Sequence, residues 1–263
     1  IAVRDAAGCV ISNNLVGGNG GSGVAVLQTD VAPSAMRAVL SQNAIGLSAA
    51  YAPVPNAGDG VLVSNAGWTL IAPLNVIGGN YGAGIAVVGL GAHDTRMYQN
   101  LIGIAPNLVD PRGNHGHGVA LTAGNANRVG GTNWWEPNRI ANNWGNGIDV
   151  ALGANDSLWG NAISNNGLMG INLGPQGRTY QPEQDGMPNR YQRYPVLSSA
   201  YGGAQTVING VLTSSPSAVF TLEFFRNSTT TRTGYAEGQS LLGRAEVATD
   251  GGGVAPFSIA FPA

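Results

Sequence analysis

The sequence predicts an all-β chain in which a three-sided coil of short strands precedes a small antiparallel β-sandwich. A phrase that runs from Asn138 to Val150 is repeated from Asn161 to Leu173, 23 residues later. The last three residues of each copy alternate apolar, polar and apolar, which is the period of a half-buried strand. Glycine is abundant, at 41 of 263 residues, and only 10% of residues are charged, which favours stacked strands with tight corners.

The coil is predicted from a glycine that is followed by apolar, variable and apolar residues. This phrase recurs at Gly23, Gly60, Gly84, Gly118, Gly147 and Gly170. Its shortest intervals, 23 and 24 residues, set the length of one turn. A period of roughly 20 to 50 residues indicates a solenoid whose repeats bury their apolar faces on one another. We expect about six to seven coils with three strands each, and the longer intervals indicate loop insertions at 32–37, 48–57, 105–115 and 132–137.

Asparagine residues are predicted to form the corners of the coil. Their side chains tolerate left-handed turns, and their amides can hydrogen-bond from one stacked strand to the next. We expect structural roles for three pairs that read as matching corners: Asn13 and Asn14, Asn142 and Asn143, and Asn165 and Asn166.

The repeated phrase, N-x-I-x-x-N-x-x-x-G-I-x-L, resembles the right-handed parallel β-helix proteins of the pectate-lyase-like superfamily. Glycine turns at Ile77-Gly78-Gly79 and Val129-Gly130-Gly131 strengthen the resemblance, which covers about residues 1–175. It implies a right-handed parallel β-helix. It is specific for the fold and poor for function, because this fold hosts lyases, hydrolases, adhesins and modules without known chemistry.

The period stops after Gly174. Residues 176–197 are rich in proline and predict a linker or crossover, which resembles the exit segment of bacterial surface proteins of this type. Residues 198–263 predict an Ig-like β-sandwich, because four stretches alternate in the manner of antiparallel strands. These stretches are 206–212, 219–225, 241–249 and 255–261.

The predicted sandwich is incomplete, since the resembling proteins carry one or two further strands, and no cap is predicted for the first coil. Open sheet edges are normally covered. We therefore expect further copies of the chain, or flanking parts of the same polypeptide, to act as partners at these edges. The first residue is Ile1 with no signal segment, which favours a processed part of something longer.

Charge and composition exclude several classes of partner. The net charge is -2 with only 12 Lys and Arg residues, so nothing indicates nucleic acid. No apolar run approaches the roughly 20 residues of a membrane span. Cys9 is the single cysteine, so an internal disulfide is excluded.

Catalysis would require clustered carboxylates or a base beside a bound uronate. Asp149 is predicted at the outward centre of a repeat, between Ala120 and Asn172, where no second carboxylate joins it. We predict no catalytic residue. If the chain is an enzyme, Asp149 and Asp156 are the suspects.

Metal binding is also not predicted. His93, Asp110, His115 and His117 are spaced too loosely for a typical ligand set, and we interpret them as solvated turn residues. Oxygen ligands in an irregular loop could hold Ca²⁺, and the candidates are Glu183, Asp185 and Asn189. No other cofactor is expected.

Aromatic side chains offer a platform on which the C–H faces of sugars could stack. Tyr98 and Trp159 each follow an inward residue and should face outward on one side of the coil. Trp134, Trp135 and Trp144 lie in turns. The alternative is that insertions or the sandwich cover these rings.

These observations predict a non-catalytic, extracellular or cell-surface module with a structural or adhesive role, as part of a longer chain or a fibre. Two alternatives remain open. One is a carbohydrate-active enzyme, a lyase or a hydrolase, with carboxylates supplied by the insertions. The other is a carbohydrate-binding module that uses the face of the coil.

Overall fold

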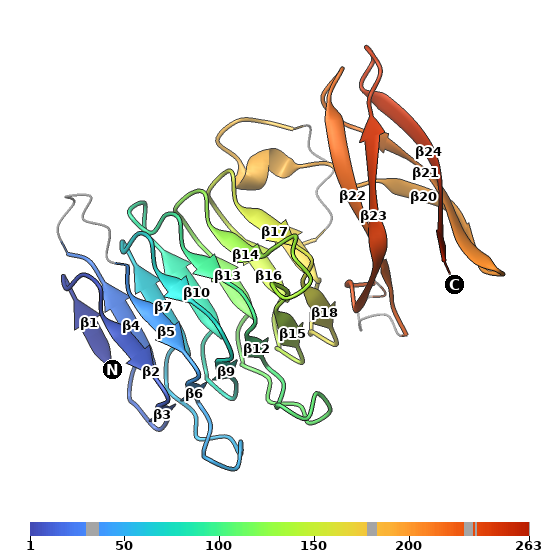
Figure 1. Cartoon of the computed structure of the whole chain (residues 1–263). Helices are drawn as coiled ribbons and strands as arrows, with labels where there is room; N and C mark the ends of the chain where they lie inside the picture. Colours follow the sequence, from blue (N-terminus) through green and yellow to red (C-terminus); the bar gives the residue numbers. More distant parts are fainter. Residues whose placement is uncertain (30–36, 178–182, 229–233, 235, 263) are drawn as a thin grey trace.

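The computed structural model describes residues 1–29, 37–177, 183–228, 234 and 236–262. Short strands stack into a parallel β-helix, and an antiparallel region follows at one end of it (Figure 1). The prediction of an all-β chain with these two parts is confirmed. The insertion predicted at 32–37 lies almost wholly outside the described residues.

Three parallel sheets form the sides of the β-helix among the described residues. Sheet A contains β1 (Ala2–Arg4), β4 (Val24–Leu27), β7 (Val61–Ser64), β10 (Ile85–Val88), β13 (Val119–Leu121), β16 (Ile148–Val150) and β19 (Ile171–Leu173). Sheet B contains β2 (Val10–Ser12), β5 (Val39–Ser41), β8 (Leu70–Ile71), β11 (Arg96–Met97), β14 (Arg128–Gly130) and β17 (Ser157–Trp159). Sheet C contains β3 (Leu15–Val16), β6 (Ala44–Ile45), β9 (Val76–Ile77), β12 (Leu101–Ile102), β15 (Arg139–Ala141) and β18 (Ala162–Ser164).

Each coil contributes one strand to each sheet, in agreement with the predicted three strands per coil. The strands pair in register with the equivalent strands of the next coil, so that Ile148 lies beside Ile171 and Ile140 lies beside Ile163. Six coils are complete in the described chain, and β19 begins a seventh. This agrees with the predicted six to seven coils.

The glycine of the repeated phrase is required by close packing between coils. A Cβ atom on Gly84 would lie 2.6 Å from Ile102 Cγ2 and 2.6 Å from the carbonyl oxygen of Gly118. Neither neighbour can retreat, because Ile102 is fully buried in the core column and Gly118 belongs to the next coil. The glycine therefore allows the turn to approach the core, where a larger residue would push the coils apart.

Asparagine side chains, which are buried in every coil after the first, form two continuous ladders along the β-helix. In each ladder the Nδ2 of one asparagine donates to the Oδ1 of the asparagine in the next coil, over 2.7 to 3.0 Å. The first ladder, between sheets B and C, consists of Asn14, Asn43, Asn75, Asn100, Asn138 and Asn161. The second ladder, which follows sheet C, consists of Asn19, Asn56, Asn80, Asn114, Asn143 and Asn166. Because each amide is satisfied in this way, the corners can be buried without orphaned polar groups.

The two members of each predicted asparagine pair have different roles. Asn13, Asn142 and Asn165 adopt left-handed conformations, with φ of 59°, 61° and 57°. The second member of each pair enters a ladder. The prediction that all three pairs occupy matching corners is wrong, because Asn14 belongs to the first ladder whereas Asn143 and Asn166 belong to the second.

A third, shorter ladder lies between sheets A and B. Asn127 donates from its backbone N and its Nδ2 to Asp156 Oδ1, at 2.8 and 3.1 Å. Thr95 donates from its backbone to Asn127, and Asp156 donates from its backbone to Asn189, a residue outside the coils. An aspartate therefore occupies a ladder position that asparagine fills elsewhere.

Residues that follow the β-helix cover the end of its last coil. Asn166 donates from its backbone N and its Nδ2 to the two carboxylate oxygens of Glu237, at 2.9 and 2.6 Å. The backbone N of Ile163 donates to the carbonyl of Gly238, and the backbone N of Gly160 donates to Glu223. The antiparallel region thus satisfies donors that a further coil would otherwise satisfy, and this protects the sheet end.

The antiparallel region forms two small sheets joined to the β-helix by a segment with one 3₁₀ turn, η1 (Pro188–Tyr191). One sheet contains β20 (Val196–Tyr201), β21 (Gln205–Thr213) and β24 (Val254–Pro262), and the other contains β22 (Val219–Arg226) and β23 (Ser240–Ala248). Their facing sides share a core that includes Ile208, Leu212 and Phe224. The four predicted strands are present, and β20 is an additional strand that begins at the end of the predicted linker and continues into the predicted sandwich. The predicted linker also includes residues outside the described range.

Candidate functional site

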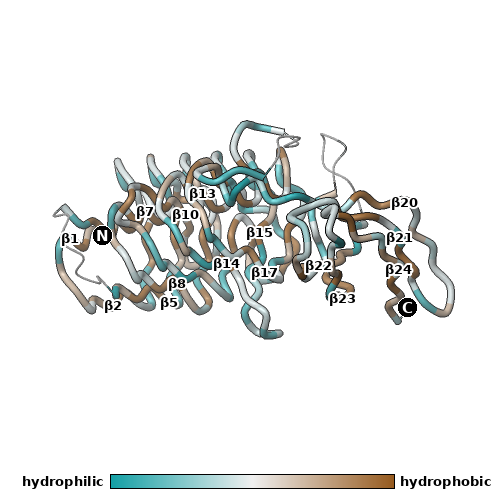
Figure 2. The backbone as a smooth tube through the Cα atoms, turned by 90° about the horizontal axis from the view of Figure 1, so that it is seen from above, coloured by the Kyte–Doolittle hydropathy of each residue, from teal (hydrophilic) through white to brown (hydrophobic). Residues whose placement is uncertain are grey.

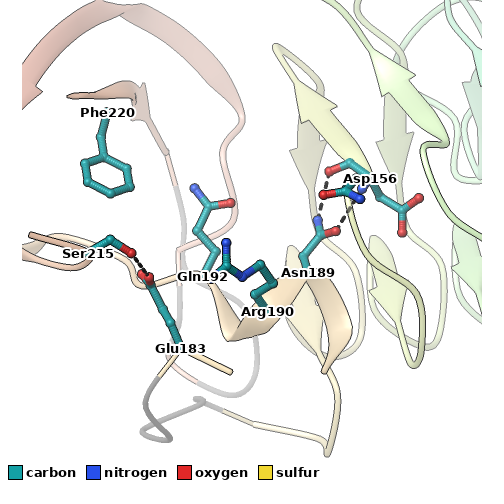
Figure 3. A pocket seen from close by; sticks show the side chains of 8 residues that line it. Asp156, Glu183, Asn189, Arg190, Gln192, Ser215 and Phe220 are labelled. Atoms are coloured by element: carbon teal, nitrogen blue, oxygen red, sulfur yellow. Dashed lines mark hydrogen bonds between the residues drawn. The ribbon is translucent and has the colours of Figure 1, made fainter. Parts of the chain in front are cut away.

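A cavity of about 300 Å³ lies where the last coil, the crossover segment and the antiparallel region meet (Figure 3). It brings together Asp156, Glu183 and Asn189, which the sequence singled out for different reasons. The lining residues are Asn155, Asp156, Glu183, Asn189, Arg190, Gln192, Ser215 and Phe220. This junction cavity is therefore the candidate functional site of the described chain.

The carboxyl group of Asp156 serves the third ladder and not the cavity. Its Oδ1 accepts from Asn127, and Figure 3 shows the carboxyl group directed away from Glu183 and Phe220. Its Oδ2 is buried and has no hydrogen-bond partner in the described part of the chain. Burial raises the pKa of Asp156 to about 6, against the bonds from Asn127 that lower it.

The three Ca²⁺ candidates, of which Glu183 and Asn189 line the cavity, have separate partners. Glu183 accepts from the hydroxyl groups of Ser214 and Ser215, and although burial alone would raise the pKa of Glu183, these bonds hold it below its usual value. Asp185 pairs with Arg190 over 2.8 Å, and Asn189 bonds to the backbone of Asp156. The three Ca²⁺ candidates thus each serve a different structural contact.

Asp149 lies in sheet A between Ala120 and Asn172, as the repeat predicts. Its Oδ1 accepts from Asn146 Nδ2 and from Asn172 Nδ2, both at 2.8 Å. Asn146 also exchanges hydrogen bonds with Gln176. Asp149 is therefore the acceptor of an amide network whose two donors, Asn146 and Asn172, are buried, whereas Asp156 lies in the corner between sheets A and B.

The histidines also have different partners from one another. His93 contacts Asp94 over 2.8 Å, His117 Nδ1 accepts from the backbone of Asn146, and His115 stacks on Trp144. Asp110 lies beside Arg112. Within the described residues no three His, Cys, Asp or Glu side chains form a group that could hold a metal ion.

The aromatic side chains on sheet B are partly covered by their neighbours. The ring of Tyr98 meets the edge of Trp135, with centroids 5.5 Å apart, and the guanidinium of Arg244 lies 6.0 Å from the ring of Trp159. Trp134 in the same loop as Trp135 is 91% exposed. The structure thus favours the reading in which an insertion and the antiparallel region cover Tyr98 and Trp159.

A second aromatic cluster, which we call the aromatic column, projects from the corner of the second ladder. It consists of Tyr81, His115 and Trp144, which directly follow the ladder residues of three successive coils. His115 and Trp144 stack with centroids 4.0 Å apart, and Tyr81 meets His115 edge-on at 4.9 Å. Sequence analysis missed Tyr81 and assigned His115 to a turn, although the position after each ladder asparagine is a signal that could have linked the three rings.

Comparisons with known proteins add no assignment. No family model matches the chain, and no curated protein matches it. No helix in the described part of the chain is long and apolar enough to cross a membrane.

Proposed function

We propose that the protein is a non-catalytic structural or adhesive module of an extracellular surface, built on a pectate-lyase-like β-helix. The observation that carries the proposal is that the two suspected catalytic acids are both engaged in structural hydrogen bonds. Asp149 lies in the middle of a sheet A strand and Asp156 in the corner between sheets A and B, and each accepts hydrogen bonds from neighbouring amides. Both roles are those of corner and surface residues that hold coils together.

The continuity of the ladders supports a mechanical role. Asparagine amides link every complete coil to the next, and Glu237, Glu223 and Asn189 extend these links into the following residues. Local unfolding of one coil would break bonds in both directions, so the coils are expected to open together. A β-helix whose coils open together is suited to act as a rod, which holds a binding surface at a distance or presents it to a partner.

A polysaccharide cleavage screen tests the non-catalytic part of the proposal. The chain is incubated with neutral and acidic polysaccharides, with and without Ca²⁺, and reducing ends and unsaturated products are measured. We expect no product above the level of a boiled control. Product that disappears in Asp149→Asn or Asp156→Asn, but persists in the exposed variant Asp185→Asn, would contradict the proposal.

Carbohydrate binding is a second candidate, because the aromatic column offers exposed rings. Trp144 is 65% exposed and Tyr81 is 57% exposed. The turn after Trp144 carries Gly167 at the equivalent position of the next coil, so no further ring covers the indole there. A sugar ring could stack on this indole through its C–H face.

Affinity electrophoresis through gels that contain neutral polysaccharides tests this candidate. Trp144→Ala is expected to lower retention about tenfold, the effect of losing one stacked sugar contact. Trp68→Ala is the matched control, because Trp68 is also exposed but packs against His93 outside the aromatic column. Equal retention of both variants and the parent chain would rule out the aromatic column as the binding surface.

A further inference from the structure

Strand β20 is an edge strand that lacks the charged residues and prolines that protect many sheet edges. It pairs with β21 on one side, and no strand in the described part of the chain pairs with its other side. Figure 2 shows the order β20, β21, β24, with β20 outermost. All six of its residues are exposed, and none is charged or proline. An uncharged, unpaired edge is a template for another strand.

The opposite edge of the same sheet is protected. Strand β24 contains Pro256 and Pro262, which cannot donate to a neighbouring strand, and it lies against β23. The two edges therefore differ in sequence as well as in surroundings. Among the described residues, the β20 edge of this sheet is the one whose outward row of backbone donors and acceptors is not interrupted by proline.

The core-facing side of β20 is also uncovered. Leu197 pairs with Gly210 and Ala200 pairs with Ile208, and Ile208 belongs to the core between the two sheets. Leu197 is nevertheless 53% exposed. The second sheet has only β22 and β23 among the described residues, and it does not reach across β20.

A β-bulge in β20 makes its two halves compatible with self-pairing. The register shifts between Leu197 and Ser199, so Val196 and Tyr201 pair with Val211 and Val207, which lie on the outer face. Without the bulge, residues five positions apart would lie on opposite faces. With it, Val196 and Tyr201 share the outer face, whereas Leu197 and Ala200 share the inner face.

We propose that two copies of this chain pair through β20, antiparallel about a twofold axis between Ser198 and Ser199. Val196 then lies opposite Tyr201 of the second copy on the outer face, and Leu197 lies opposite Ala200 on the inner face. An aromatic side chain opposite a β-branched one is a favourable cross-strand pair. Twofold symmetry makes the paired strands antiparallel, which continues each three-stranded sheet into one sheet of both copies.

This pairing deepens the proposed function, since it names the partner of a structural module, and it rests on that proposal. Measuring the mass in solution over a dilution series tests it. The mass of the parent chain is expected to rise from one chain to two with concentration. Ser199→Lys brings two ammonium groups together across the axis and is expected to weaken dimerisation at least about tenfold. Ser258→Lys, on the exposed side of β24, is the matched control and leaves dimerisation unchanged.

Disulfide cross-linking tests the register in a background in which Cys9 is replaced by serine. Residues that flank the axis on one face fall within disulfide reach, so Ser199→Cys is expected to yield a covalent dimer under oxidation and Ser258→Cys is not. A single-chain mass at every concentration, or a dimer that survives Ser199→Lys, would overturn the inference. The pairing and the proposed non-catalytic function can fail separately, because only the pairing depends on β20. A Ser199→Lys variant that is monomeric and still inactive in the cleavage screen supports both proposals.

Discussion

Replacing Asn114 by aspartate is expected to lower the free energy of unfolding by about 3 kcal/mol at neutral pH, the range for an unpaired buried polar or charged group. Asn114 is fully buried in the second ladder. Its Nδ2 donates to Asn143 Oδ1 over 2.9 Å, and its Oδ1 accepts from Asn80 over 2.8 Å. A carboxylate keeps the acceptor but replaces the donor by an oxygen that faces another oxygen.

The loss of stability in Asn114→Asp should depend on pH in a definite direction. Burial raises the pKa of a carboxyl group, and the protonated form can donate to Asn143. The destabilisation should therefore be small in acid and should grow as pH rises through the raised pKa. Urea unfolding at pH 4 and pH 8 measures this. Asn13→Asp is the matched control, because Asn13 is exposed, and equal losses at the two positions would contradict the role of the ladder.

The opposite replacement, Asp156→Asn, is expected to stabilise the fold by about 2 kcal/mol above pH 6. Asp156 already occupies a ladder position, where its Oδ2 is buried without a partner. An amide there can donate to Asn189 Oδ1, which already accepts from the backbone of Asp156. The variant should also lack the pH dependence of stability that Asp156 causes, since the pKa of Asp156 is raised to about 6 from an ordinary value of 3.8.

The sign of the pH dependence follows from that raised pKa. Between about pH 4 and pH 6 the folded chain binds a proton at Asp156 that the unfolded chain has released, so the stability of the parent falls as pH rises through this window. The pKa shift from 3.8 to about 6 sets an upper bound of about 3 kcal/mol on this effect, and about 2 kcal/mol is expected. Thermal unfolding from pH 4 to pH 8 should show parent and variant converging in acid. Asp185→Asn, at an exposed ion pair, should leave the slope unchanged.

The coil was predictable from sequence because its period is local. Each Gly-apolar-x-apolar phrase packs against the same phrase of the next coil. Gly84, for example, packs against Gly118, its equivalent in the next coil, so the contact is marked by the repeat itself. Strand β20 was not predictable in the same way. It stays exposed on both faces, so its sequence, V-L-S-S-A-Y, carries no clear alternation to mark a buried side.

The junction cavity was only partly predictable. Asp156, Glu183 and Asn189 were each singled out, but their proximity depends on how the crossover folds back onto the last coil, and no repeat encodes that. The aromatic column was within reach of sequence, since Tyr81 and Trp144 follow ladder asparagines at matching positions. The insertions between these coils hid the match, because they make the spacing in sequence unequal.

The asparagine ladders give the β-helix an electrical direction. In every asparagine–asparagine bond of the two long ladders, the Nδ2 donor lies in the coil nearer the first and the Oδ1 acceptor in the coil nearer the last, so these hydrogen-bond dipoles add along the axis. The second N–H of several of these amides donates to a backbone carbonyl of the preceding coil. Peptide dipoles add in the same way along an α-helix, with partial positive charge at the end that presents donors. The carboxylate of Glu237 meets the donor end of the second ladder. The two ends of the β-helix therefore carry opposite partial charges: an anionic side chain, Glu237, occupies the positive end at the last coil, and cations are favoured at the first coil.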